Sequence, residues 1–438
     1  MSATASEPAR ASIADERPPD AVRGERASSP QGDSPLARLT PQQLEQLGRE
    51  LDAIHDRVFA QLGERDARYI RNTIRLHRQL VVAARAALLG SRSRPLWLAG
   101  TVALSLAKVL ENMEIGHNVM HGQWDWMNDP DINSQAWDWD TASPADAWRH
   151  SHNYEHHTFT NIRGKDRDLG YEIMRIDPHQ PWHPVYLLQP LYNLVLMGFF
   201  EWGVALHDLN FDAIRSGEKS KQQVLGELKA IGAKARRQVV KDYLAFPALA
   251  AALSAAAPAG PDRPRGRGRP RRSGGRRRHG RREAAVRAFK ATLAANFTAN
   301  IARNVWAHSI IFCGHFPDGT YTFSEEEVAD ETRGGWYVRQ LLGAANIEGR
   351  ALFHFLSGNL SFQVEHHLFP DMPSSRYSEV APQVQEVCAR YGLPYNTGPL
   401  RKQLGSVHRT ILRLAFPGGG SQPRITSDAC AGSGEPDG

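Results

Sequence analysis

The sequence predicts an all-α integral membrane protein with about four transmembrane helices and a cytosolic helical cap that holds metal-binding histidines. Two observations lead to this prediction. Several long apolar tracts interrupt a chain that is otherwise rich in polar residues. Eight of the 18 histidines, seven of them candidate ligands, also fall within three short windows beside those tracts. Such a protein must bring distant histidines together on one side of the membrane.

The composition argues against two classes of protein. The three cysteines are far apart and form no C-x-x-C pair, which excludes a disulfide scaffold and suggests a reducing compartment. Eleven arginines gather in residues 261–283 with two acids, whereas the whole chain has a net charge of +6, so the basic character is local. Because no aromatic residue interleaves these arginines, no nucleic-acid partner is expected.

The chain begins with a predicted disordered tail, residues 1–37, which is rich in Ser, Pro, Ala and charged residues. It has no apolar core after a basic start, so it does not resemble a secretory signal. An amphipathic helix is predicted to follow Thr40, with Pro41 in its first turn and Gln43 completing a capping-box pattern. Apolar residues recur along this helix at steps of three and four: Leu44, Leu47, Leu51, Ile54 and Val58.

Five apolar tracts are candidates for membrane spans. A span needs ~20 mostly apolar residues. The tracts lie at 79–92, 95–113, 185–206, 243–258 and 291–313. The second and third are the most continuous, and each of the others, taken alone, is also compatible with a buried helix of a soluble protein. Several tracts in one chain favour a membrane protein.

The topology follows from the need to keep the histidine windows on one side. An even number of crossings must separate the second window from the third, and the pair 243–258 and 291–313 is expected to supply them. The tract 185–206 then lies along the interface or packs internally. If it crossed, the Lys/Arg-rich stretch 215–241 would lie outside, against the positive-inside rule. We therefore expect the metal site to face the cytosol from the cytoplasmic membrane.

The arginine-rich run does not fit this topology. It falls in the external turn between the last two spans, where many arginines violate the positive-inside rule. A solvated segment is one interpretation. The one we favour is that residues 259–285 are an anomalous insert or a local reading-frame error, since out-of-frame coding sequence rich in G and C yields Arg, Gly, Pro and Ala.

Three histidine clusters carry the candidate chemistry. They read GHNVMHGQW at 116–124, HSHNYEHHTFTN at 150–161 and QVEHH at 363–367. The candidate ligands that they contain are His117, His121, His152, His156, His157, His366 and His367. A lone H-x-x-x-H pair would be a weak indication of a metal site, whereas three clusters in one membrane chain are a strong one.

The spacing of the histidines suits two ions. Residues four apart lie on one face of a helix, so His117 and His121 can face one ion, and His152 and His156 repeat this spacing. His157 points about 100° away, which suits a second ion. Neutral imidazole binds Fe, Zn, Cu and Ni, but a closed zinc site takes four ligands, commonly with cysteine. Seven histidines without a nearby thiolate exceed one zinc ion, so we favour two Fe ions.

The three boxes, in this order and with hydrophobic pairs between them, resemble those of the membrane fatty acid desaturase family. The likeness extends through ENMEIGHNVMHGQWDWMNDP, WRHSHNYEHHTFTNIRGKDRDLG, IFCGHFPDG and GNLSFQVEHHLFPDMP, and covers roughly residues 70–245 and 286–412. These runs are similar to linoleoyl-CoA-type acyl desaturases of actinobacteria, and the glutamine of QVEHH resembles the front-end branch. We accordingly expect a desaturase domain over 38–412, followed by a second disordered tail, 413–438.

The resemblance implies an enzyme whose di-iron centre and O2 co-substrate remove two hydrogens from an acyl chain carried on CoA or on a lipid. Breaking an aliphatic C–H bond needs an oxidant that no side chain provides, so a metal must supply it. The front-end branch often carries a fused haem domain with an H-P-G-G motif, which this sequence lacks. Electrons from NAD(P)H are therefore expected through a separate ferredoxin or flavoprotein reductase, beside membrane lipid as the other partner.

The resemblance also suggests ligands from the helix before the third box, namely Asn304, His308 and His315, although Asn304 is also suited to a helix–helix hydrogen bond. Acidic groups are expected to accept hydrogen bonds from ligand imidazoles. The candidates, each of which can instead face water, are Glu111, Glu114, Asp125, Asp166 and Asp168. Gln363 lies one turn before the last histidine pair, and we expect it to bond a bound water, an oxygen species or a ligand histidine.

Two alternative functions stay open. A membrane di-iron hydroxylase of fatty acids or alkanes has the same boxes, and ligand spacing does not separate hydroxylation from desaturation; the QVEHH box and the likeness around GHFPDG favour desaturation. The other is a non-catalytic membrane protein that binds or transports metal. Transport predicts polar residues along the spans, whereas these histidines cluster beyond the span ends.

Overall fold

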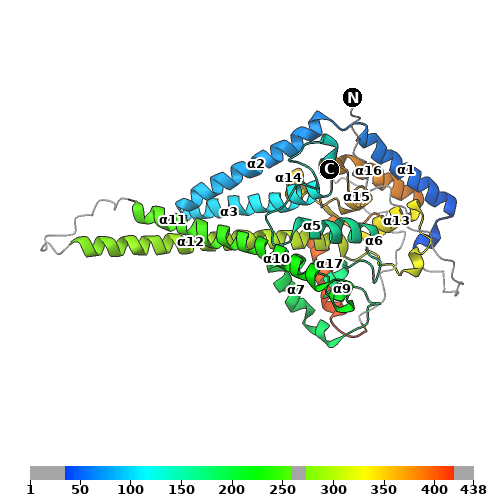
Figure 1. The fold of residues 1–438 in the computed structure, drawn as a ribbon. Coiled ribbons are helices and arrows are strands. Elements are labelled where there is room, and N and C mark those ends of the chain that lie inside the picture. The colour runs from blue at the N-terminus through cyan, green and yellow to red at the C-terminus, as the bar shows by residue number, and fades with distance from the viewer. Residues whose placement is uncertain (1–34, 258–272, 419–438) are drawn as a thin grey trace, which may run out of the picture.

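The computed structural model describes residues 35–257 and 273–418, which form a mostly helical protein (Figure 1). The longer helices are α1 (Pro41–Phe59), α2 (Glu64–Leu89), α3 (Arg94–Leu110), α7 (Gln189–Gly198), α10 (Lys221–Val239), α11 (Phe246–Ala256), α12 (Ser273–His315), α13 (Arg333–Gly343), α16 (Tyr377–Tyr391) and α17 (Leu400–Leu414). The short helices are α4 (Asn118–Met120), α5 (Ala145–Trp148), α6 (His157–Phe159), α8 (Phe200–His207), α9 (Phe211–Ser216), α14 (Ala351–Leu356) and α15 (Gln363–Leu368).

Tighter and wider helical turns connect these helices. The π-helical turns are η3 (Glu111–His117), η5 (Arg149–His156) and η8 (Val240–Ala245). The 3-10 turns are η2 (Pro35–Arg38), η4 (Asp125–Met127), η6 (Leu169–Glu172), η7 (Pro184–Leu188), η9 (Glu326–Val328) and η10 (Ser374–Arg376). The strands β1 (Asn346–Glu348) and β2 (Thr397–Pro399) pair in parallel, with Asn346 opposite Thr397.

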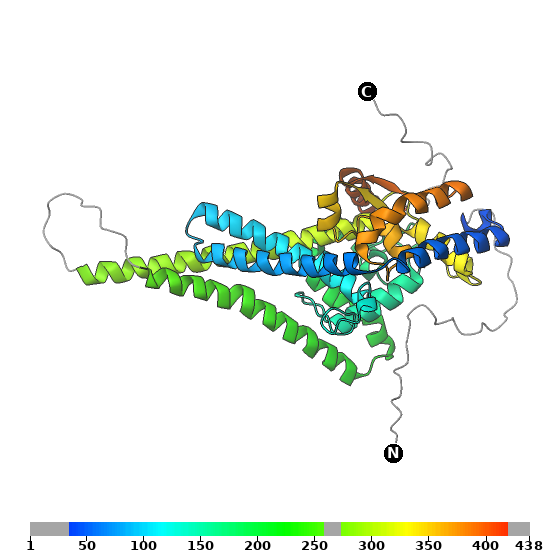
Figure 2. The ribbon, with the colours of Figure 1, turned by 90° about the horizontal axis from the view of Figure 1, so that it is seen from above.

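Four long helices form an elongated bundle at one end of the molecule. Figures 1 and 2 show α2, α3, α11 and α12 extending away from a cap that contains α1, α13, α15 and α16. Within the described ranges, the continuous run Lys221–Ala256 is the one helix that is long and apolar enough to cross a membrane by length and composition. The all-α prediction is confirmed, and the prediction of about four spans stays a prediction.

The tract 185–206 does not form one long helix. It forms the 3-10 turn η7, then α7, and after a break at Phe199 the short helix α8. Each is far shorter than the ~20 residues that a span needs. This agrees with the prediction that the tract does not cross the membrane. Its exposed apolar side chains suit an interfacial position: Leu187, Leu188, Leu191, Leu194 and Val195.

The cap core forms around α1. Thr40 Oγ1 accepts a hydrogen bond from the backbone of Gln43 at 3.2 Å and Gln43 Oε1 accepts one from the backbone of Thr40 at 2.9 Å, so the predicted capping box is present. Four of the five predicted apolar positions of α1 are buried against α13 and α16: Leu47, Leu51, Ile54 and Val58. These contacts attach the N-terminal helix to α13 and α16, which both contact α15, the helix of the third histidine box.

The predicted tails and insert fall partly outside the described residues. Residues 1–34 and 419–438 lie outside them, whereas η2 begins at Pro35 and α17 ends at Leu414. Of the arginine-rich segment 259–285, residues up to 272 lie outside and the rest begins α12 as a helix. The interpretation as an insert or frame error stays a prediction.

Candidate metal centre

The histidines of the three boxes reach one place from separate elements. The first box comes from η3 and the turn after α4, the second from η5 and the start of α6, and the third from α15. His315, the last residue of α12, comes from a fourth element. Seven of these side chains are buried: His117, His121, His156, His157, His315, His366 and His367. Residues hundreds of positions apart in the sequence therefore form one buried cluster.

Two of the boxes lie in π-helical turns, which are rare and often occur at functional sites. The sequence interpretation assumed an α-helix, on which His152 and His156 face one ion. A π turn takes more residues than an α turn, but the side chains of His152 and His156 still lie together on one side. The two rings are stacked with centroids 5.0 Å apart, and with Asp168 they form a group whose candidate ligand atoms lie within 4.8 Å of one another.

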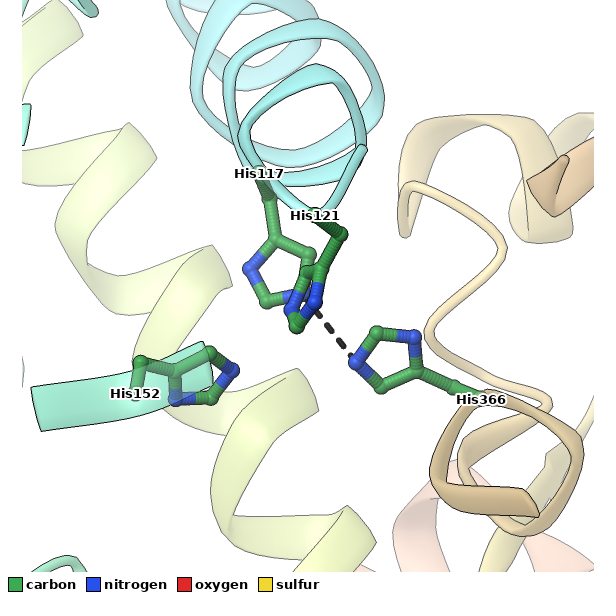
Figure 3. A group of neighbouring side chains, drawn as sticks. All are labelled: His117, His121, His152 and His366. Carbon is green, nitrogen blue, oxygen red and sulfur yellow. Dashed lines mark hydrogen bonds between the residues drawn. The ribbon is translucent and has the colours of Figure 1, made fainter. Parts of the chain in front are cut away.

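Two further groups consist of histidines alone, and within each the candidate ligand atoms lie within 4.8 Å of one another. The first group contains His117, His121, His152 and His366, and the second contains His156, His315 and His367. Figure 3 shows the first group converging from three ribbons, with Nε2 of His117 and Nε2 of His366 3.3 Å apart. Two compact groups of imidazoles are suited to two metal ions.

His157 lies between the two groups. Its ring stacks on His367 of the second group, with centroids 4.5 Å apart and planes at 17°. Its centroid is also 4.7 Å from that of His121 and 4.9 Å from that of His366, both of the first group. Neither ring nitrogen of His157 has a hydrogen-bond partner among the described residues. This side chain is therefore placed to complete either group.

The unpartnered nitrogens test whether these residues fit a metal. Nε2 of His121, His152 and His156 is buried without a hydrogen-bond partner in the described part of the chain. A buried polar atom left in this way costs free energy, and coordination to a metal ion removes that cost. The donor set is imidazole, which iron binds readily. The residues present fit the predicted iron centre.

Carboxylates orient two of the histidines from behind. Asp166 Oδ1 lies 3.0 Å from Nδ1 of His156, and Asp168 Oδ2 lies 3.2 Å from Nδ1 of His152. The other oxygen of Asp168 lies 3.0 Å from Nε2 of His207. An acceptor on Nδ1 leaves Nε2 free for a metal. Sequence reasoning named both acids as candidates but missed His207, which follows an apolar tract in no recognisable motif.

Neutral groups orient the third box. Nδ1 of His366 lies 3.2 Å from the hydroxyl of Tyr377, and Nδ1 of His367 lies 3.1 Å from Oε1 of Gln340. Sequence reasoning missed Tyr377 and Gln340, because they lie on helices outside the boxes and only the fold brings them together. A glutamine oxygen accepts but does not donate, so it fixes a proton on Nδ1 of His367.

Electrostatics keeps most of these imidazoles ready to bind a cation. Burial, and after it the neighbouring imidazoles, hold the pKa of six of them well below its usual value: His117, His121, His157, His315, His366 and His367. Burial also acts to lower the pKa of His156, but the charges of Asp166 and Asp168 outweigh it and raise this pKa. Neutral imidazole is the form that binds metal.

Gln363 and Glu114 occupy different places around the cluster. Nε2 of Gln363 donates to Nε2 of His315 at 3.1 Å, so the glutamine faces a histidine, one of the three kinds of partner predicted for it. Glu114 instead accepts hydrogen bonds from Tyr69 at 2.8 Å and Ser374 at 2.9 Å. Glu114 binds no histidine among the described residues. Its two hydrogen bonds instead connect η3 to α2 and to η10.

Asn304 and His308 do not join either group. Nε2 of His308 lies 3.0 Å from Oδ1 of Asn193, and its ring stacks on Phe312 with centroids 3.7 Å apart. Nδ2 of Asn304 donates to the carbonyl of Gly198 at 2.9 Å, which is the helix–helix hydrogen bond considered as its alternative. On α12 the two side chains contact α7, and Asn304 also lines a cavity that it shares with His117 and His152. We therefore leave them out of the ligand set proposed below.

A cavity adjoins the first group of histidines. His117, His152 and Asp168 line one part of it. Its apolar lining comes from Met113, Trp139, Trp148, Phe200, Val204 and Ile311. The Trp148 ring stacks on that of His152, with centroids 4.6 Å apart. An apolar chain in this cavity would lie directly beside the metal-binding nitrogens.

Comparisons with known proteins agree with this geometry. The family model described as fatty acid desaturase matches residues 95–399. The chain is 44% identical over 382 residues to an NADPH-dependent stearoyl-CoA 9-desaturase of Mycobacterium tuberculosis, covering 87% of this chain and 82% of that protein. It is 40% identical over 86 residues to fatty acid desaturase 3 of Homo sapiens, covering 20% and 19% of the two chains. No solved structure matches the chain.

Proposed function

Because the chain belongs to the membrane fatty acid desaturase family, we propose that it introduces a double bond into a fatty acyl-CoA by means of two iron ions and O2. The chain is a fatty acid desaturase enzyme. The name of the mycobacterial relative supports CoA rather than a lipid as the acyl carrier, and stearoyl-CoA as the substrate to test first.

The two groups of histidines would each hold one iron ion. The four of the first group leave room for a further ligand, and the three of the second group are completed by His157. When bound, the iron ions supply the oxidising power that removes two hydrogens from the acyl chain, which no side chain can do. The residues of the chain fix the imidazoles: Asp166 and Asp168 hold two rings through Nδ1, and Gln340 and Tyr377 hold two others.

The cavity beside His117 and His152 would hold the acyl chain. The aromatic side chains that line the cavity would exclude water from the reacting carbon atoms, and the ring of Trp148 stacks on that of His152. Excluding water prevents loss of the oxidant to side reactions. We also propose that the bundle spans the cytoplasmic membrane with the cap in the cytosol, where acyl-CoA and a separate NAD(P)H-linked ferredoxin or flavoprotein reductase are available.

The observation that carries this proposal is the pair of buried histidine groups with unpartnered Nε2 atoms beside an apolar cavity. The test is to express the chain in a host with a simple fatty-acid profile and to map new double bonds by mass spectrometry. An 18-carbon product with a new double bond, together with about two irons per purified chain, is the expected result.

Two outcomes would contradict the proposal. Hydroxylated acyl chains without any new alkene would favour the membrane hydroxylase. Much less than two irons per chain, with no further loss in the variant His156→Ala, would contradict the di-iron centre. The matched control is His408→Ala, because His408 lies on α17 outside both groups.

A further inference from the structure

Helix α10 stands apart from the rest of the protein. Figure 2 shows the helical run from α11 to α10 diverging from the bundle towards the N-terminus of α10. Gln238 is the one buried residue of this helix. Most helical stability in proteins comes from packing of one face against other elements, so a helix this poorly covered is expected to contact something further.

The outward face of α10 carries a basic stripe. Lys221, Leu225, Lys229 and Arg236 follow one another at helical spacing and are all exposed, with 57% of Leu225 accessible. The three basic residues form no ion pair within the described part of the chain. The helix as a whole has five basic residues and one acid. A cationic stripe with an exposed leucine at its centre fits an acidic protein surface with an apolar patch.

The length of the helix places this stripe outside the membrane. The continuous run Lys221–Ala256 has 36 residues, which corresponds to ~54 Å of α-helix. The hydrocarbon core is only ~30 Å thick. If the last ~20 residues of this run cross it, the N-terminal part of α10 projects from the membrane, and its basic residues belong on the cytosolic side. A soluble cytosolic protein can therefore reach the stripe.

The opposite face of α10 touches the wall of the metal cavity. Nζ of Lys234 donates to the carbonyl of Trp139 at 2.6 Å and also pairs with Asp138. The Trp139 ring contacts Trp148, with centroids 5.0 Å apart, and Trp148 stacks on His152. One side of α10 thus faces the cytosol, while the other is joined to a metal-binding histidine through two buried aromatic rings.

From this arrangement we propose that the basic stripe of α10 is the docking surface for the electron donor, an acidic one-electron carrier protein. The inference rests on the proposed function. In that reaction O2 accepts the two hydrogens of the acyl –CH2–CH2– unit, two electrons and two protons, and forms two waters and –CH=CH–. The two electrons come one at a time from the reduced carrier, which docks where Trp139 and Trp148 connect the surface to the site.

The test uses the double variant Lys229→Glu/Arg236→Glu of the full chain in nanodiscs of zwitterionic lipid, with a reduced acidic [2Fe–2S] ferredoxin as the probe. We expect the KM for ferredoxin to rise about tenfold or more, and the dissociation constant to rise in parallel. Single turnover driven by dithionite should stay unchanged. The matched control, Arg401→Glu/Lys402→Glu, reverses two exposed charges on α17 and should change the KM less than twofold.

Several results would overturn the proposal. They include an unchanged ferredoxin KM in the double variant, and a wild-type chain that turns over with dithionite but does not bind ferredoxin. A loss confined to binding of phosphatidylglycerol vesicles would assign the stripe to the membrane instead, and a changed oligomeric state with unchanged KM would assign it to a second copy. Failure of dithionite-driven turnover in the wild type would contradict the proposed function itself. In that case the dissociation constant for ferredoxin, compared between the wild type and the double variant, would still test the docking surface.

Discussion

Nδ1 of His156 lies 3.0 Å and 3.1 Å from the two carboxylate oxygens of Asp166, and both side chains are buried. The carboxylate is itself held in place, because it accepts hydrogen bonds from the backbone N–H groups of Asn161 at 2.7 Å and Asp168 at 3.0 Å. The loop after the second box therefore fixes the acid, and the acid fixes the imidazole. This leaves Nε2 of His156 directed at the second group of histidines.

Replacing Asp166 with asparagine should weaken the second metal position. The amide is neutral and can present N–H towards Nδ1, so the ring loses the partner that orients it. Loss of such an outer partner typically costs 10–100-fold in metal affinity or activity, and we expect a loss of about that size in turnover and iron retention. Iron per chain after dialysis measures it. Asp371→Asn is the control, since that acid meets the half-buried His55 on the cap surface; equal losses in both variants would contradict the prediction.

Two histidines of the same helix should behave differently. His315→Ala removes a member of the second group and should lower iron towards one per chain, with loss of desaturation. His308→Ala removes a hydrogen bond to Asn193 and a stacked ring, so it should cost stability and leave the iron content unchanged. Iron analysis with a thermal unfolding curve for each variant separates the two effects. Loss of iron in His308→Ala at an unchanged Tm would instead show that His308 is an iron ligand.

Gly314 should not tolerate a side chain. A Cβ at this position would lie 2.7 Å from Cγ and 2.9 Å from Cδ of Gln363, which is closer than real contacts allow. Gly314→Ala should displace Gln363 from His315 and reduce turnover about tenfold or more, since displacements of about 1 Å can cost 10²-fold. The control is Gly405→Ala, where the nearest side-chain atom is 3.9 Å away. Wild-type turnover in Gly314→Ala would show that the position of Gln363 does not matter.

The sequence was most informative where local spacing and composition decide the outcome. The capping box at Thr40 and the buried stripe of α1 depend on neighbours within one helix, and both were predicted correctly. The convergence of the three boxes was also predictable, because random scatter would not place eight histidines in three short windows of a membrane chain. These features depend on residue types that are close together in the sequence.

The rest depends on contacts that sequence spacing does not contain. The second box forms the π-helical turn η5, and no residue in the box signals it. His207 and Tyr377 become partners of the site only because α8 and α16 pack beside it. Similarly, Asn304 and His308 have the spacing of a ligand pair, but the rotation of α12 turns them towards α7 and α8.

Glu365, which lies within the third box and accepts a hydrogen bond from Asn346 of β1, should make stability depend on pH. It is fully buried, and burial raises the pKa of its carboxyl from 4.5 to about 7, although Asn346 and Tyr395 donate hydrogen bonds that act to lower it. The folded protein then binds this proton more tightly than the unfolded chain. The contribution of this carboxyl to the free energy of unfolding is greatest below about pH 4.5. It falls as the pH rises through about 7, by a total of about 3 kcal/mol.

The variant Glu365→Gln removes this proton and should flatten the dependence. We expect the Tm of the wild type to fall between pH 5 and pH 8 by several degrees more than the Tm of the variant, because 1 kcal/mol shifts Tm by about 2–4 °C in larger domains. Measuring both proteins at matched iron content removes the separate effect of metal binding on stability. Glu348→Gln, at an exposed position of β1, is the control and should keep the wild-type slope. Parallel Tm curves for the wild type and Glu365→Gln would mean that another buried group, and not this carboxyl, sets the pH dependence.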